Sequence, residues 1–269
     1  MIHRFYLFLL CTIPISVSAQ VVTQDTLMAR YTALQVALDR LETITADELM
    51  ETEWDINPKV GELLIRLLEI PGLTDQEIDS LVPPSELNRA RSADGRLCIF
   101  SWDERTGGTF RSQVSVVFFR LPTGEGKGFY STVDENDEWN KGGAYNSIHQ
   151  LRSDSTSTVY ACVGQVIGCS SCCGDILTII ELTNGGINFN YPAFEAKGRE
   201  GQANGVFSPT FLLTTRCGNG LRFEYDPGTN TLTYVYIVDD LTPMEMKDAD
   251  DAREIRGIMH FNGAYFEEE

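Results

Sequence analysis

The sequence predicts an α+β fold in which an N-terminal helical segment precedes an antiparallel β-rich body: a sandwich, roll or barrel stapled by disulfides. Up to about residue 84, apolar residues recur mainly at helical spacing. Beyond it, short β-branched and aromatic runs follow one another with turn residues between them, which argues against alternating βα units. We therefore divide the chain into a signal peptide (1–19), a helical segment (20–84) and a β-rich domain (85–269).

The first residues have the three-part layout of a secretory signal peptide. A basic start ending at Arg4 precedes an apolar run from Phe5 to Ile15, and small residues lead to Ala19. The apolar run is shorter than the roughly 20 residues that a membrane-spanning helix needs. We expect cleavage after Ala19 and a secreted or periplasmic product with no integral membrane segment after cleavage.

Four helices are predicted in the helical segment. Over 23–44, apolar residues fall at spacings of 3 and 4, which places them on one helix face. The three further helices begin at recognisable start signals, which are Thr45 with Glu48, Asn57 before Pro58, and Thr74 with Glu77. The first and last pairs are capping boxes, whereas Asn57 is predicted to be an N-cap followed by proline at the first helical position. Pro83 and Pro84 end the segment.

The β-rich domain contains eight predicted strands, at 97–102, 114–121, 159–163, 176–182, 206–214, 221–225, 232–238 and 255–261. The turns between them are rich in Gly, Asn, Asp and Pro, and include Asp94-Gly95, Gly124-Glu125-Gly126, Asn184-Gly185-Gly186, Asp226-Pro227-Gly228 and Asn262-Gly263. Such turns predict antiparallel hairpins. The polar stretch at 132–145 is expected to be a loop, and that at 241–254 a loop or one short helix. A propeller is disfavoured because the Trp102-Asp103 dipeptide does not recur.

An even number of cysteines remains after Cys11 leaves with the leader, and in an exported chain this points to disulfides. The candidates are Cys98, Cys162, Cys169, Cys172, Cys173 and Cys217. Six cysteines allow 15 pairings, and the sequence does not choose among them. Because a bond between neighbours strains the backbone, Cys172 and Cys173 are expected to pair with different partners. Local closure within 164–174 is one option, with Cys98 or Cys217 tied to this segment across the sheet.

Two alternatives for these thiols remain. A zinc site built from Cys162, Cys169, Cys172 and Cys173 is disfavoured because only one C-x-x-C knuckle is present. Redox catalysis by Cys169-Ser-Ser-Cys172 would need the first thiol at a helix N-terminus. A strand-like run follows instead, so the motif is expected in a loop between strands. No metal or cofactor is expected.

Charge excludes nucleic-acid binding as the main activity, because the formal net charge is -18 and phosphate contacts need clustered Lys and Arg. An acidic surface would suit a basic partner or a cation. The acidic runs are not EF-hands, since Trp139 stands where that loop needs glycine. Of the two histidines in the mature chain, His149 and His260, neither lies in a recognisable catalytic motif.

Carboxylates beside tryptophans are the remaining candidates for a site. They are Trp102, Asp103, Glu104, Asp134, Asp137 and Trp139. Hydrolysis of a glycan needs two carboxylates roughly 5 to 10 Å apart in an aromatic-lined cleft. Solvated turns also have this composition, so the residues are assigned to binding and none to catalysis. The predicted function is an exported, non-enzymatic binding or protein-interaction module whose partner is an envelope or extracellular protein or a glycan. The alternative is a secreted hydrolase that uses an Asp/Glu pair on carbohydrate.

Overall fold

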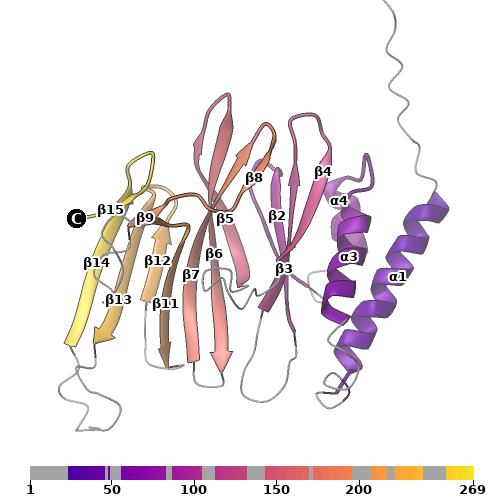
Figure 1. The fold of residues 1–269 in the computed structure, drawn as a ribbon, viewed down its shortest axis with the longest axis horizontal. Helices are drawn as coiled ribbons and strands as arrows, with labels where there is room; N and C mark the ends of the chain where they lie inside the picture. The colour runs from indigo at the N-terminus through magenta and orange to yellow at the C-terminus, as the bar shows by residue number, and fades with distance from the viewer. Residues whose placement is uncertain are drawn as a thin grey trace, which may run out of the picture.

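The computed structural model describes residues 24–45, 48, 56–82, 87–104, 113–131, 143–169, 172–195, 207–216, 222–238 and 253–269. These residues form a stack in which a helical layer is followed by three sheets (Figure 1). The α+β assignment, with N-terminal helices before antiparallel sheets, is therefore confirmed. The predicted signal peptide lies outside the described residues.

The helical layer contains α1 (Gln24–Thr43), α3 (Ile56–Leu68) and α4 (Asp75–Leu81). The predicted helix over 23–44 is confirmed by α1. The capping box that opens α4 is also confirmed, because the Thr74 hydroxyl accepts from the Glu77 amide and the Glu77 carboxylate accepts from the Thr74 amide. Thr45 and Glu48 make the same reciprocal bonds, at 3.0 and 3.2 Å, but the helix expected after them lies largely outside the described residues.

The N-cap predicted at Asn57 is wrong. Helix α3 already begins at Ile56, and Asn57 is buried inside its first turn. Its side chain accepts a hydrogen bond from Trp102 and donates one to the carbonyl of Glu104. The amide is therefore used to bind the helix to the neighbouring sheet, a tertiary role that a local start signal does not reveal.

The first sheet has the order β1-β2-β3-β4 and lies against the helices. The middle sheet has the order β11-β7-β6-β5, with β8 paired to β7, and the last sheet has the order β10-β9-β15-β14-β13-β12. In the described part of the chain, the strands pair antiparallel except for a single parallel bridge between β15 and β9. The bounds of the strands are β1 Asn88–Arg91, β2 Leu97–Asp103, β3 Gln113–Arg120, β4 Gly126–Ser131, β5 Ala144–Ser153, β6 Ser157–Cys169, β7 Cys172–Thr183, β8 Gly186–Asn188, β9 Phe194–Glu195, β10 Phe207–Ser208, β11 Thr210–Arg216, β12 Arg222–Asp226, β13 Thr231–Val238, β14 Arg253–Phe261 and β15 Phe266–Glu268.

All eight predicted strands are present, with 206–214 divided between β10 and β11. The predicted turns close the hairpins β1-β2, β3-β4, β7-β8, β12-β13 and β14-β15. The sequence prediction missed β4, because its alternating glycines resemble a turn. It also missed β5 entirely, and the first two residues of that strand, Ala144 and Tyr145, fall within the stretch that was expected to be a loop.

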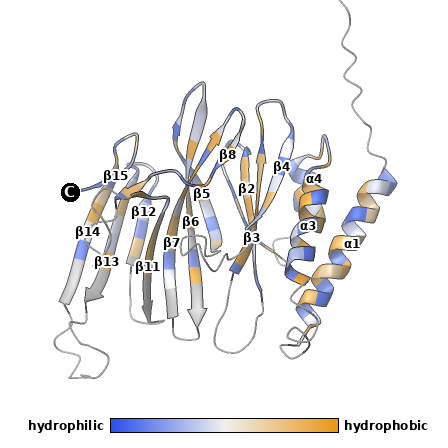
Figure 2. Ribbon diagram, in the orientation of Figure 1, coloured by the Kyte–Doolittle hydropathy of each residue, from blue (hydrophilic) through white to orange (hydrophobic). Residues whose placement is uncertain are grey.

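Three hydrophobic cores separate the four layers. Because successive strand residues point to opposite faces, Phe100 packs towards the helices and Ile99 towards the middle sheet. The middle sheet is buried on both sides, with Tyr160 facing the first sheet and Val159 facing the last. Figure 2 shows how hydrophobic residues concentrate in these inner strands. The β-rich body is thus a stack of three sheets, with two sheet-on-sheet interfaces instead of the one in a simple sandwich.

Close contact between α3 and β4 depends on glycine. A Cβ on Gly128 would lie 2.7 Å from a side-chain atom of Ile65, a separation that real Cβ atoms do not adopt. The Gly128 amide also donates to the Glu69 carboxylate just beyond the helix, at 3.0 Å. The glycines of β4 therefore let the helix backbone approach the strand, and Tyr130 on the same strand face packs against the helical core.

The structure does not support disulfides at Cys98 or Cys162, which are both buried and free. Cys98 lies in the core between the helices and the first sheet, whereas Cys162 lies in the core between the first and middle sheets. The first sheet therefore stands between the two thiols. Burial raises the pKa of the Cys98 thiol to about 11 and raises that of Cys162 as well, so both behave as small apolar residues. Cys217 lies outside the described residues.

Candidate interaction surface

Trp102 is a core residue and not part of an exposed binding site. It is 6% exposed, its ring stacks on Tyr130 at 5.9 Å between centroids, and its Nε1 donates to Asn57 Oδ1 at 2.9 Å. The prediction that Trp102 binds a ligand is therefore wrong. Its aromatic ring fills the space between β2, β4 and α3, and its one polar atom is satisfied there.

The other sequence candidates are only partly described. Asp103 ends β2 and Glu104 follows it, and both are half-buried at the end of the first sheet. Asp134, Asp137 and Trp139 lie outside the described residues. Within the described part of the chain, no group of three or more His, Cys, Asp or Glu side chains is arranged to hold a metal.

Two phenylalanines from different sheets form an exposed pair. Phe129 on β4 is 45% exposed, and Phe189, directly after β8, is 38% exposed. Their rings meet edge to face with centroids 6.0 Å apart. Behind them Phe119, which is fully buried, stacks on Phe129 at 5.9 Å. We call Phe129 and Phe189 the aromatic pair.

The strand pattern explains why Phe129 is exposed. Neighbouring residues of β4 point to opposite faces, so Tyr130 enters the helical core while Phe129 points towards the middle sheet. Phe129 is the register partner of Val117, yet it lies on the edge strand of the first sheet, where the middle sheet covers it only in part. Phe189 meets its ring edge to face and Phe119 stacks on it, which leaves part of Phe129 and part of Phe189 exposed to solvent.

A charged pair lies on the same strand face. Lys127, two residues before Phe129, places its Nζ 3.7 Å from a carboxylate oxygen of Glu125. Aromatic side chains at the centre and charged groups at the rim are the composition typical of protein interfaces. Sequence reasoning missed this surface, because the Gly124-Glu-Gly-Lys-Gly stretch indicated only a turn.

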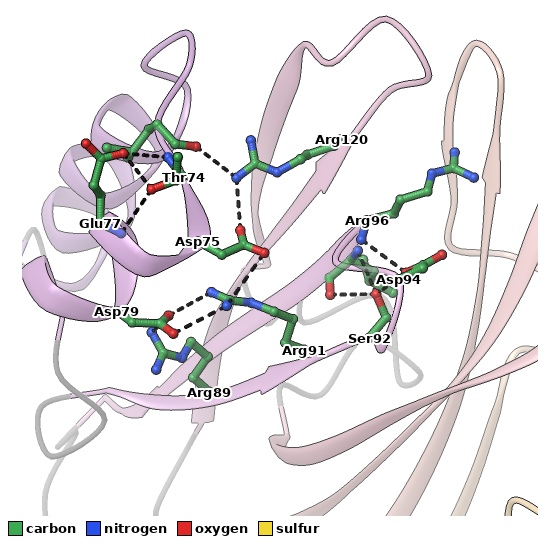
Figure 3. A network of polar contacts seen from close by, with 12 residues as sticks. Thr74, Asp75, Glu77, Asp79, Arg89, Arg91, Ser92, Asp94, Arg96 and Arg120 are labelled. Carbon is green, nitrogen blue, oxygen red and sulfur yellow. Dashed lines mark hydrogen bonds and ion pairs between the residues drawn. The ribbon is translucent and has the colours of Figure 1, made fainter.

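A cluster of charged side chains docks α4 on the first sheet (Figure 3). Asp79 binds both Arg89 and Arg91 of β1, at 2.7 and 2.9 Å. Asp75, at the start of α4, accepts from Arg120 of β3 at 3.0 Å and lies 3.7 Å from Arg91. Arginine and carboxylate therefore alternate across the seam between the helix and the sheet, and each charge has a partner there.

A second polar group joins the first sheet to the middle sheet. Asp94, in the β1-β2 turn, accepts from the Ser92 hydroxyl, the Arg96 amide and the Tyr160 hydroxyl. Burial by itself would raise the pKa of this carboxyl, but the three hydrogen bonds outweigh burial and leave the pKa below its ordinary value. Asp94 is therefore held ionised as a structural acceptor.

The histidines lie in sheets and bind neighbouring side chains. His260 on β14 contacts the Thr231 hydroxyl and the Glu269 carboxylate, each at 2.9 Å. His149 on β5 contacts Ser147 at 3.0 Å and packs beside the ring of Tyr225. Both therefore have the partners expected of structural sheet histidines.

Comparison of the chain with protein-family models, with curated proteins and with solved structures found no match in any of the three. A search of the described helices for a membrane span found none that combines the necessary length with the necessary apolar character.

Proposed function

We propose that the protein is an exported, non-enzymatic protein-interaction module that binds its partner through the aromatic pair. The supporting observation is that Phe129 and Phe189 touch across two sheets yet leave much of each ring in solvent. Fully burying a phenylalanine side chain is worth about 1.5 to 3 kcal/mol, so covering the rest of both rings favours association. Phe119 stacks on Phe129 from behind, and this contact reduces the side-chain freedom that Phe129 has left to lose on binding.

The charge of the chain indicates the kind of partner. With a formal net charge of -18, the protein attracts basic surfaces and repels acidic ones. We propose an envelope or extracellular protein whose binding face combines an apolar centre with Lys and Arg at its rim. Association should then slow as salt is added, because opposite charges accelerate the encounter more than they strengthen the final complex.

Affinity capture from the native envelope fraction tests this proposal. The bait carries Phe129→Ser and Phe189→Ser, and the matched control carries Met28→Ser and Val36→Ser, which remove two exposed apolar residues of α1. A partner retained by the wild-type chain and the control but lost from the aromatic variant supports the proposal. Equal retention by all three baits contradicts it.

The rival function is tested separately. A glycan-hydrolysis screen is run on the wild-type chain and on Asp103→Ala and Asp137→Ala variants, each checked for unchanged folding by circular dichroism. A hydrolytic activity that either substitution abolishes would overturn the non-enzymatic assignment.

Export is part of the proposal. Determination of the N-terminus of the protein isolated from its native source should find Gln20 first, because the three-part leader predicts cleavage after Ala19. An intact Met1 on cytosolic protein would remove both the proposed location and the oxidising environment that disulfides need.

A further inference from the structure

The hairpin between β6 and β7 brings two cysteines opposite each other. Cys169 ends β6, Cys172 begins β7, and the two are register partners across the antiparallel ladder. Only Ser170 and Ser171 separate them in the sequence. We propose that Cys169 and Cys172 form a disulfide that closes this hairpin, and the proposal rests on the export described above.

A β-bulge creates the juxtaposition. Ile167 is opposite Cys173, but the next pair along the ladder joins Cys169 to Cys172, so the ladder advances two residues on β6 and one on β7. Gly168 is the extra residue, and glycine is common at such bulges. With an unshifted register, Gly168 would instead stand opposite Cys172. The irregularity therefore places one thiol-bearing residue against another.

The backbone spacing of such a pair suits a disulfide. Directly opposed residues of an antiparallel ladder have Cα atoms about 4.5 or about 5.5 Å apart, according to their hydrogen bonding. Cysteines joined by a disulfide have Cα atoms about 4.4 to 6.8 Å apart. Cys173, the next residue, has Thr215 of β11 as one register partner and Ile167 of β6 as the other. Of the two neighbouring cysteines, Cys172 and Cys173, it is therefore Cys172 that has a cysteine as a register partner.

The bond forms by thiol–disulfide exchange. One thiol loses its proton and attacks an oxidant disulfide, either a small-molecule disulfide such as oxidised glutathione or a disulfide-donating enzyme, and one oxidant thiolate leaves. The second cysteine then attacks the mixed disulfide and the other oxidant thiolate leaves. The two cysteines together lose two protons and two electrons, and the oxidant disulfide gains both to become two thiols.

Peptide mass spectrometry tests the pairing directly. The full chain is isolated from its native source, denatured without reductant, treated with N-ethylmaleimide and digested with trypsin. The tryptic peptide from Ser153 to Lys197 holds Cys162, Cys169, Cys172 and Cys173, and separates them from Cys98 and Cys217. In a Cys173→Ser variant this peptide should carry one maleimide, on Cys162, and be two hydrogens lighter than its reduced form.

The matched control is the Cys172→Ser, Cys173→Ser double variant. It should lose the two-hydrogen deficit completely and carry a maleimide on both Cys162 and Cys169. Three maleimides on the Cys173→Ser peptide, a bridge from Cys169 or Cys172 to the Cys217 peptide, or zinc bound by reduced thiols would each overturn the pairing.

A second measurement separates this inference from the proposed location. Purified, reduced Cys173→Ser protein is equilibrated in glutathione buffers of increasing oxidising strength, and the same peptide is followed. Formation of the Cys169–Cys172 bond there supports the pairing even if the chain is not exported. Export confirmed at Gln20 with both thiols still free in the most oxidising buffer would reject the pairing and leave the location intact.

Discussion

The hydroxyl of Tyr160, on β6 of the middle sheet, donates a hydrogen bond of 2.6 Å to the carboxylate of Asp94 in the β1-β2 turn of the first sheet. Close beside it, Arg96 donates to the Thr158 hydroxyl at 3.1 Å. The Asn88 side chain on β1 likewise donates to the Tyr145 carbonyl on β5 at 2.6 Å, within packing that is mainly apolar and non-directional. These three hydrogen bonds therefore help to fix the angle at which the first and middle sheets meet.

Replacing Tyr160 with phenylalanine should destabilise the protein by about 1 kcal/mol at neutral pH. This value is below the usual range for a bond to a charged acceptor, because water can solvate the Asp94 carboxylate once the hydroxyl is removed. Urea denaturation followed by circular dichroism measures the change. An unchanged free energy of unfolding would show that the Tyr160 bond does not stabilise the interface between the sheets.

The effect of Tyr160→Phe should also depend on pH. The folded-state pKa of Asp94 is depressed, so its contribution to stability is fully present above the unfolded value of about 3.9 and is lost as the pH falls through the folded-state pKa. The difference between wild-type and variant should therefore shrink in acid. Tyr225→Phe is the control, because its hydroxyl donates to the uncharged side chain of Asn230 and its effect should not follow this titration.

Arg120→Ala should loosen α4 and lower the free energy of unfolding by about 1 to 2 kcal/mol. One guanidinium nitrogen of Arg120 donates to the carbonyl of Leu73 at 3.1 Å and to Asp75 at 3.0 Å, which are both at the start of the helix. Hydrogen exchange should become faster in α4 before it does so in β3. The exposed pair Lys59 and Glu62 supplies the control, since Lys59→Ala should change stability by less than about 0.5 kcal/mol.

Gly128→Ala should cost about 1 to 3 kcal/mol, because the new methyl group overlaps Ile65 and forces α3 away from β4. Gly185→Ala, in the β7-β8 turn, is the matched control, since the nearest atom to its Cβ is the Thr183 hydroxyl oxygen at 4.0 Å. Thermal unfolding of both variants compares them. Equal melting temperatures for the two would mean that the close approach of α3 to β4 is absent in solution.

The buried thiols should resist alkylation in the native state. Burial raises the pKa of Cys98 to about 11 and that of Cys162 too, so neither forms much of the reactive thiolate at pH 8. Iodoacetamide should label both only after urea is added. Rapid labelling of either thiol without denaturant would contradict its position in the core.

The sequence predicted those parts of the fold that depend on local signals. Helix α1 follows from apolar spacing and the start of α4 from the Thr74 capping box, and the hairpin turns follow from their Gly, Asn and Asp residues. Asn57 carried a local signal as well, but tertiary contact with Trp102 determines what it does. Strand β4 carried a misleading local signal. Its glycines suggest a turn, but they make room for α3, which is distant in the sequence.

The candidate surface was not predictable in the same way. Phe129 and Phe189 are 60 residues apart in the numbering, and each resembles an ordinary strand or turn phenylalanine. Their meeting depends on how the first sheet stacks on the middle sheet, which no local pattern encodes. Trp102, in contrast, resembled a binding residue because a carboxylate follows it, and the same stacking buries it.

Site-specific photocrosslinking in the native host tests the proposed surface most directly. A photoreactive phenylalanine analogue is placed at position 129 and, as a control, at position 36 on the exposed side of α1. Irradiation should give one discrete adduct with another protein from position 129, which Phe189→Ser weakens, and none from position 36. No adduct from position 129, or the same adduct from both positions, would contradict the assignment of the aromatic pair as the binding surface.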